Sequence, residues 1–190
     1  MGERVKVRGR QINVGCVRRT VPAFLGLRPM KFLVDQPLGG LAKWLRFCGF
    51  DAALVRLNPD KPGSLPPPSP RTHILTRQAA SQRLKRPDLL ILAAPDPEGQ
   101  LQEVLLRLDL SPRHLKPLTR CRHCNDPLAP LSRELVQSRV SEHVFLHHRR
   151  FYECPRCHRV YWPGSHIQGI TGTLRDQLEQ LRDRGADPSQ

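Results

Sequence analysis

Four cysteines in two Cys-x-x-Cys pairs are the residues of this sequence whose spacing points most directly to chemistry. The pairs are Cys121–Cys124 and Cys154–Cys157, with 29 residues between them. A thiolate is a soft, charged ligand, and the two-residue spacing lets both sulfurs of a pair converge on one tetrahedral ion. Two such pairs predict a closed four-thiolate zinc site, which supplies folding energy and leaves no coordination position open for chemistry.

Two disulfides, or a redox-active Cys-x-x-Cys centre, are the alternative interpretations. A redox motif needs one such pair near a β-α-β unit, whereas this sequence carries the pair twice. Disulfides would fit an exported protein, but we expect a cytoplasmic one, in which cysteines stay reduced and bind metal. With four thiolates already present, we expect His123, His158 and His166 to be surface or knuckle residues rather than ligands.

Charge indicates the class of partner. The chain has 190 residues, 31 Lys and Arg against 17 Asp and Glu, and a formal net charge of +14. Such a surplus favours nucleic acid or an anionic membrane surface over neutral partners. The sequence has no apolar run of 18 residues, so we expect no membrane span.

Residues 1–29 carry seven lysines and arginines against one acid, Glu3. A short apolar stretch after Arg18 and Arg19 faintly resembles an export signal, but Pro22 interrupts it. A basic arm for nucleic acid and an organellar targeting peptide are two further interpretations. We expect a basic, disordered extension, because the pattern of an ordered domain begins at Met30.

From Met30 onward, short apolar runs alternate with helical patterns, which predicts a parallel sheet flanked by helices. Strands are expected at 32–35, 52–57, 72–76 and 88–93, and helices at 38–48, 79–84 and 100–108. Six prolines in residues 58–70 exclude a helix there. We therefore expect an α/β domain at 30–112, a zinc module at 117–170, and a short helix with a polar tail at 171–190.

Several motifs resemble one known family. Residues 32–46 read FLVDQPLGGLAKWLR and are followed by CGFD at 48–51, ILTR at 74–77 and QLQEVL at 100–105. The cysteine pairs lie in TRCRHCN at 119–125 and CPRCHRVYWPGSH at 154–166. In this order, over about residues 30–170, they resemble the Mut-seven C-terminal RNase domain family. The resemblance implies a PIN-like nuclease fold, a parallel sheet flanked by helices, followed by a small C-terminal zinc ribbon.

The resemblance also implies a catalytic site. PIN-like nucleases gather carboxylates at the C-terminal ends of parallel strands, where they hold Mg²⁺ or Mn²⁺ ions that activate water for attack on a phosphodiester. Asp35 is similar to the first of these acids and Asp96 to a late one, although a helix cap or turn is the alternative role for Asp35. The family's Thr-Arg-Asp motif reads Thr-Arg-Gln at residues 76–78, and an amide adds no charge to a metal site. An upstream glutamate of the family falls in residues 68–71, which read PSPR.

Basic residues and aromatics alternate in the zinc module, a pattern that suits single-stranded nucleic acid. The alternative is a solvated basic face with the aromatics buried over the metal site. The candidate RNA contacts are Lys43, Arg46, Arg77, Arg122, Arg149 and Arg150. We expect an RNA-directed, metal-dependent ribonuclease with impaired catalysis. A non-catalytic RNA-binding protein and a zinc-stapled protein-interaction module are the alternatives.

Overall fold

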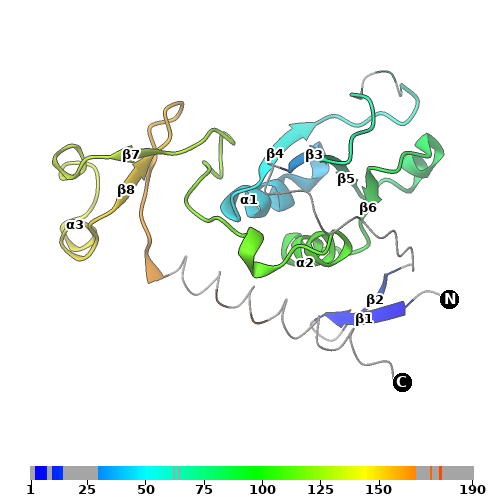
Figure 1. Ribbon diagram of the computed structural model, residues 1–190, viewed down its shortest axis with the longest axis horizontal. Coiled ribbons are helices and arrows are strands. Elements are labelled where there is room, and N and C mark those ends of the chain that lie inside the picture. The colour runs from blue at the N-terminus through cyan, green and yellow to red at the C-terminus, as the bar shows by residue number, and fades with distance from the viewer. Residues whose placement is uncertain are drawn as a thin grey trace.

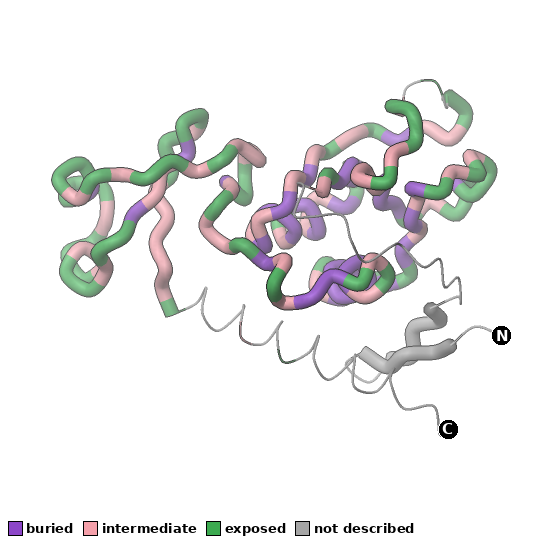
Figure 2. The backbone as a smooth tube through the Cα atoms, in the orientation of Figure 1, coloured by how far each residue is buried: buried purple, intermediate pink, exposed green. Residues whose placement is uncertain are grey.

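The computed structural model describes the backbone of residues 3–7 and 10–14, and residues 30–61, 63, 65–165, 172 and 176 in full. Figure 1 shows an α/β part built on a parallel sheet and, beside it, a smaller antiparallel part. Figure 2 shows that the buried residues concentrate in the α/β part. The expected fold class is confirmed.

The parallel sheet has four strands in the order β4-β3-β5-β6. Its strands are β3 (Lys31–Asp35), β4 (Asp51–Val55), β5 (Thr72–Thr76) and β6 (Leu89–Ile91). Each falls on an apolar run that the sequence marked as a strand. In the register, Asp35 pairs with Val55, and Thr76 pairs with Ile91. All four strands therefore end at one edge of the sheet, where open α/β folds place their ligand sites.

Helices α1 (Gly39–Phe47) and α2 (Pro97–Arg107) pack on each other and on one face of the sheet. Their apolar stripes form the larger core with the inward side chains of the strands, including Phe32, Val34, Leu41, Leu45, Leu75, Leu101 and Leu105. Helix α2 begins at Pro97 rather than at Gln100, because the Asp96 carboxylate accepts a hydrogen bond from Gly99 N (2.9 Å) and caps the helix. Proline is well suited to that first helical position.

The opposite face of the sheet is covered thinly. A small cluster of Leu33, Leu57 and Ile74 is buried there, with Leu65 and Leu84 packed against it. Leu84 comes from η3 (Ala79–Leu84), a 3₁₀ helix where the sequence predicts a short helix. Leu65 belongs to the proline-rich segment, whose described residues contain no α-helix, as expected.

A 3₁₀ turn, η4 (Pro112–His114), leads from α2 toward the antiparallel part. There β8 (Phe151–Glu153) pairs with both β7 (Ala129–Leu131) and β9 (Val160–Tyr161). The segment between β7 and β8 holds a 3₁₀ turn, η5 (Arg133–Leu135), and a short helix, α3 (Glu142–His147), which the sequence analysis did not predict. Ser141 caps α3 by accepting a hydrogen bond from Val144 N (3.4 Å).

Near the N-terminus, β1 (Glu3–Val7) and β2 (Arg10–Val14) pair as an antiparallel hairpin in register Val5↔Ile12. The sequence analysis expected no strands there, although β-branched residues alternate with polar ones in both segments. Of the segment 171–190, where a short helix is expected, the structure describes residues 172 and 176, and both are helical. Within the described part of the chain, no helix combines the length and the apolar character needed to cross a bilayer.

Candidate active site and metal centre

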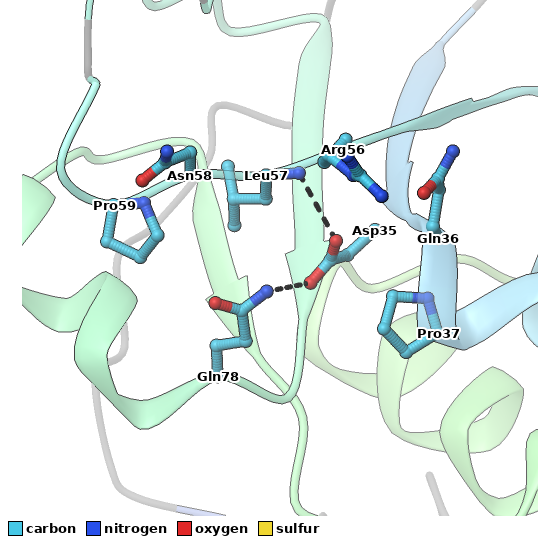
Figure 3. Close-up of a pocket in the computed structure, with 8 residues that line it drawn as sticks. All are labelled: Asp35, Gln36, Pro37, Arg56, Leu57, Asn58, Pro59 and Gln78. Carbon is cyan, nitrogen blue, oxygen red and sulfur yellow. Dashed lines mark hydrogen bonds between the residues drawn. The ribbon is translucent and has the colours of Figure 1, made fainter.

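A pocket of about 430 Å³ opens at the edge of the sheet where the parallel strands end. Figure 3 shows the residues that line it: Asp35, Gln36, Pro37, Arg56, Leu57, Asn58, Pro59 and Gln78. They come from the segments that follow β3, β4 and β5. Among these described lining residues, Asp35 is the one carboxylate and Arg56 the one cation.

Asp35 lies on the inner wall of this pocket, with a relative exposure of 3%. Its Oδ1 accepts a hydrogen bond from Leu57 N (3.3 Å), and its Oδ2 accepts one from the Thr76 hydroxyl (2.8 Å). The side chain makes no capping bond to the 3₁₀ helix η1 (Gln36–Leu38) that begins directly after it. The helix-cap alternative is therefore excluded, and Asp35 faces the ends of the neighbouring strands.

Gln78 completes the set of donors around Asp35. Its Nε2 lies 2.7 Å from Asp35 Oδ2, and its backbone N–H donates to the Thr76 hydroxyl (3.1 Å). Figure 3 shows the amide pointing directly at the carboxylate. A hydrogen-bond donor thus lies at the position where a shared metal ion would require a second anionic oxygen.

Asp96 lies outside the set of residues that line the pocket. It follows β6 on the same edge of the sheet, but its carboxylate caps α2 through Gly99 N. The start of α2 touches the start of α1, because a Cβ on Gly40 would lie 2.5 Å from Cγ of Pro97. The structure therefore places Asp96 near this edge, in a helix-capping role.

A buried acid also holds this edge of the sheet. Glu103 is 5% exposed, and its Oε2 accepts from Ala93 N (2.9 Å) and Ala94 N (3.1 Å). Its Oε1 pairs with Arg107 at 3.2 Å. Glu103 thereby fixes the loop after β6, which is a structural role.

Three polar residues of the pocket were not predicted from the sequence. Gln36 directly follows β3, and Arg56 and Asn58 follow β4. Their position after parallel strands was the signal available, because the segments that follow neighbouring strands meet at one edge. No acid marks these positions, so the arginine and the two amides were not expected there.

The four cysteines of the antiparallel part converge as predicted. Their Sγ atoms all lie within 4.8 Å of one another, and Cys121 Sγ is 3.7 Å from Cys157 Sγ. That separation is too long for a disulfide and close to the edge of about 3.8 Å expected for a tetrahedron with Zn–S bonds near 2.3 Å. The donor set and its spacing therefore fit one zinc ion.

Neighbouring groups place hydrogen-bond donors and a cation beside these sulfurs. Tyr161 Oη lies 3.1 Å from Cys121 Sγ, and Cys124 N donates to the same sulfur (3.3 Å). Burial, followed by this contact with Cys121, raises the pKa of Tyr161, so its hydroxyl keeps its proton and donates. A hydrogen bond to Cys157 raises the pKa of Arg159, which therefore places a cation at the second pair.

Each cysteine pair is followed by a residue with positive φ. Asn125 has φ of 70° and His158 has φ of 56°. Neither His123 nor His158 belongs to the ligand cluster, and His158 Nδ1 instead lies 3.2 Å from Glu153 Oε1. His166 lies outside the described residues.

The candidate RNA contacts fall into separate places. Arg77, which is exposed, directly precedes Gln78 at the pocket. Lys43 of α1 and Arg122 of the first knuckle are exposed and lie at one junction, because Arg46, one turn from Lys43, donates to the Arg122 carbonyl (3.3 Å). Exposed Arg159 follows the second cysteine pair, and partial burial, followed by the charges of Arg159, Arg122 and Lys43, lowers the pKa of His123. Arg149 and Arg150 follow α3, at the far end of the antiparallel part (Figure 1).

Arg46 is buried, unlike the other candidate RNA contacts. Its relative exposure is 6%, and its guanidinium donates to three backbone carbonyls, those of Ala52 (2.8 Å), Arg122 (3.3 Å) and His123 (2.9 Å). Burial lowers its pKa, and the charges of Cys121, Cys124 and Asp51 oppose this effect. Because its Nε and Nη1 already have partners inside the molecule, Arg46 has a structural role, and an RNA contact through it stays a prediction.

Comparisons with known proteins agree with this geometry. The family model described as the Mut7-C RNAse domain matches residues 30–174, which include the parallel sheet, both long helices and all four clustered cysteines. Searches of curated proteins and of solved structures find no match. Since the family match covers most of the 190 residues, the chain belongs to the Mut7-C RNase domain family.

Proposed function

We propose that this chain is an RNA-directed hydrolase of its family in which the divalent-metal site is weak. The observation that carries the proposal is the hydrogen bond of 2.7 Å between Gln78 Nε2 and Asp35 Oδ2. Asp35 has the position and burial of a metal-binding carboxylate at a strand end. Gln78 supplies it with a donor instead of a second negative charge.

The residues present fit a divalent ion only in part. Asp35 would hold Mg²⁺ or Mn²⁺, which supplies activation of water and stabilisation of charge on a phosphodiester when bound. Gln78 would have to turn its Oε1 toward the ion and thereby lose its bond to Asp35. Losing a hydrogen bond to a charged group costs about 1.5–3 kcal/mol. That cost corresponds to a metal affinity lower by about 10- to 100-fold.

The chain's own residues would bind and orient the substrate. Arg56, on the pocket rim beside Asp35, offers a guanidinium to a phosphate, and exposed Arg77 lies next to Gln78. Glu103 and Thr76 hold the ends of β6 and β5 in place around the pocket. These groups would bind and orient RNA whether cleavage is fast or slow.

RNA binding without turnover is the second candidate function. It is favoured by exposed Lys43 and Arg122 at the junction of α1 with the first knuckle, and by exposed Arg159 after the second cysteine pair, none of which lines the pocket. Such a surface attracts phosphates independently of any divalent ion. For the four cysteines we propose one structural zinc, since their spacing fits a closed tetrahedral site.

The test is incubation of the purified full chain with end-labelled single-stranded RNA, with Mn²⁺ and with chelator. We expect RNA binding in both conditions and slow cleavage only with Mn²⁺. Asp35→Asn should abolish the cleavage and leave the binding in place. Cleavage that persists in Asp35→Asn would show that the site lies elsewhere. Binding without any cleavage by the unaltered chain would favour the second candidate.

A further inference from the structure

The first zinc knuckle, residues 121–125, is joined to the edge of the parallel sheet. Strand β4 is an edge strand that pairs only with β3 among the described strands, so the backbone groups of Ala52 that face away from β3 need other partners. Asn125 Oδ1 accepts from Ala52 N (3.0 Å), and Arg46 Nε donates to Ala52 O (2.8 Å). Two side chains thus take the place of a further strand.

Arg46 also binds the knuckle, and Asn125 also binds the first residue of β4. The Arg46 guanidinium donates to the carbonyls of Arg122 and His123, the two residues between Cys121 and Cys124. Asn125 Nδ2 donates to Asp51 Oδ1 (2.7 Å). This contact gives Asp51 a structural role.

A backbone contact continues this junction. Lys116 N donates to Cys48 O (2.8 Å), directly after α1. Gly49 has φ of +91°, and a Cβ on it would lie 2.2 Å from Lys116 O. Only glycine allows this approach. The chain leading to the first knuckle is therefore packed tightly against the end of α1.

The knuckle can present these groups only while its turn is fixed. The turn between Cys121 and Cys124 positions the carbonyls of residues 122 and 123, and Asn125, in the left-handed conformation, follows it. Binding of both cysteines to one metal ion supplies the folding energy of such a module. Without the metal, Arg46 would remain in the α/β part with two acceptors lost. A buried guanidinium without partners destabilises the elements that surround it.

Strand β4 connects this junction to the pocket. From Ala52 the strand runs to Val55, which pairs with Asp35, and Leu57 just beyond donates its N–H to the Asp35 carboxylate. A change in the order of β4 therefore weakens the hydrogen bond that holds the Asp35 carboxylate at the wall of the pocket. The same junction brings α1, which carries exposed Lys43, against the first knuckle, which carries exposed Arg122. Exposed Arg159 follows Cys157, which belongs to the same cysteine cluster.

We propose that metal loading of the four cysteines docks the zinc module onto the edge of β4, with Arg46 and Asn125 as the coupling residues. Docking assembles a bipartite basic surface from Lys43, Arg122 and Arg159. The docking itself needs no substrate. The statement that this surface takes single-stranded RNA rests on the proposed function.

Asn125→Gly tests the docking with little effect on the metal site. Glycine adopts φ of 70° without strain and keeps the knuckle turn, but it removes the bonds to Ala52 and Asp51. The matched control is His158→Gly. It also introduces glycine after a cysteine pair, at φ of 56°, and the side chain of His158 contacts Glu153 within the zinc module.

The measurement is amide hydrogen exchange of the full chain with zinc, and after zinc removal by a chelator under reducing conditions. In the natural chain, zinc removal should speed amide exchange at residues 51–57 as well as in the zinc module. We expect an increase of about tenfold or more, and each tenfold step corresponds to about 1.4 kcal/mol of coupling between zinc binding and the order of β4. Asn125→Gly should show fast exchange at 51–57 even with one zinc bound, and His158→Gly should behave as the natural chain does.

Protection of residues 51–57 that survives zinc removal would overturn the proposal, and so would an equal effect of both glycine variants. Single-stranded RNA binding by the three zinc-loaded proteins separates the two claims. We expect Asn125→Gly alone to bind more weakly. Loss of protection with unchanged RNA affinity would leave the docking in place and overturn the RNA role of the bipartite surface.

Discussion

Replacing Gln78 by aspartate should convert the pocket into a stronger metal site at the expense of stability without metal. The change removes the donor that lies 2.7 Å from Asp35 Oδ2 and puts a second carboxylate beside the first. Loss of a hydrogen bond to a charged group costs about 1.5–3 kcal/mol. Repulsion between the carboxylates adds to this, up to about 4 kcal/mol at 4 Å and an effective dielectric constant of 20. We expect a net loss of about 2–4 kcal/mol, because Gln78 is only half-buried and the new carboxylate can turn toward water.

Manganese should reverse most of this loss. A ligand present at 100 times its dissociation constant stabilises the folded state by about 2.7 kcal/mol. If the natural chain binds the ion about 100-fold more weakly, the same Mn²⁺ concentration adds only about 0.4 kcal/mol to its stability. Urea unfolding with and without Mn²⁺ measures both quantities.

Two further variants isolate the cause. Gln78→Ala loses the same hydrogen bond without adding charge, so Mn²⁺ should not rescue it. The double variant Asp35→Asn, Gln78→Asp should bind Mn²⁺ as weakly as the natural chain does. Equal stabilisation of the natural chain and Gln78→Asp by Mn²⁺ would refute the reasoning, because Gln78 would then not limit metal binding.

Four further outcomes are expected. Cys121→Ser should lose zinc and unfold the zinc module, and full zinc occupancy of this variant by elemental analysis would contradict the four-thiolate site. A chain that starts at Met30 should melt within a few degrees of the full chain, and insoluble expression would show that residues 1–29 belong to the core. Charge reversal of Arg149 and Arg150 should weaken RNA binding for all sequences alike and flatten its salt dependence, whereas binding indifferent to salt would point to a protein partner. Glu103→Ala should lower the free energy of unfolding by about 1–3 kcal/mol in urea titrations, because it leaves Ala93 N and the buried Ala94 N without their acceptor. An unchanged value would remove the structural role of Glu103.

Local pattern was sufficient to predict the elements of the α/β part. The apolar runs of β3 and β5 and the spacing of leucines in α1 each match one period, so tertiary context did not have to decide between helix and strand. Helix α3 was missed because six residues are too few to show helical periodicity. The start of α2 was placed late because the cap at Asp96 and Pro97 was not used as a helix signal.

The site residues were harder to predict because their roles depend on contacts distant in sequence. Lys43 and Arg46 lie on one polar face of α1, so the pattern gave both the same role. The structure separates them, because the zinc knuckle, 76 and 77 residues further along the chain, covers Arg46 and leaves Lys43 exposed. The substitution at Gln78 was visible in the sequence, but its direct bond to Asp35 across 43 positions was not.

The most direct test of the account is the rate of RNA cleavage by the natural chain and by Gln78→Asp, measured side by side across a Mn²⁺ titration under single-turnover conditions. The account predicts that the variant cleaves faster and reaches its half-maximal rate at a lower Mn²⁺ concentration, by about 10- to 100-fold. It also predicts that Asp35→Asn removes the activity of both proteins. Equal rates and equal Mn²⁺ dependence in the two proteins would contradict the claim that Gln78 weakens the metal site.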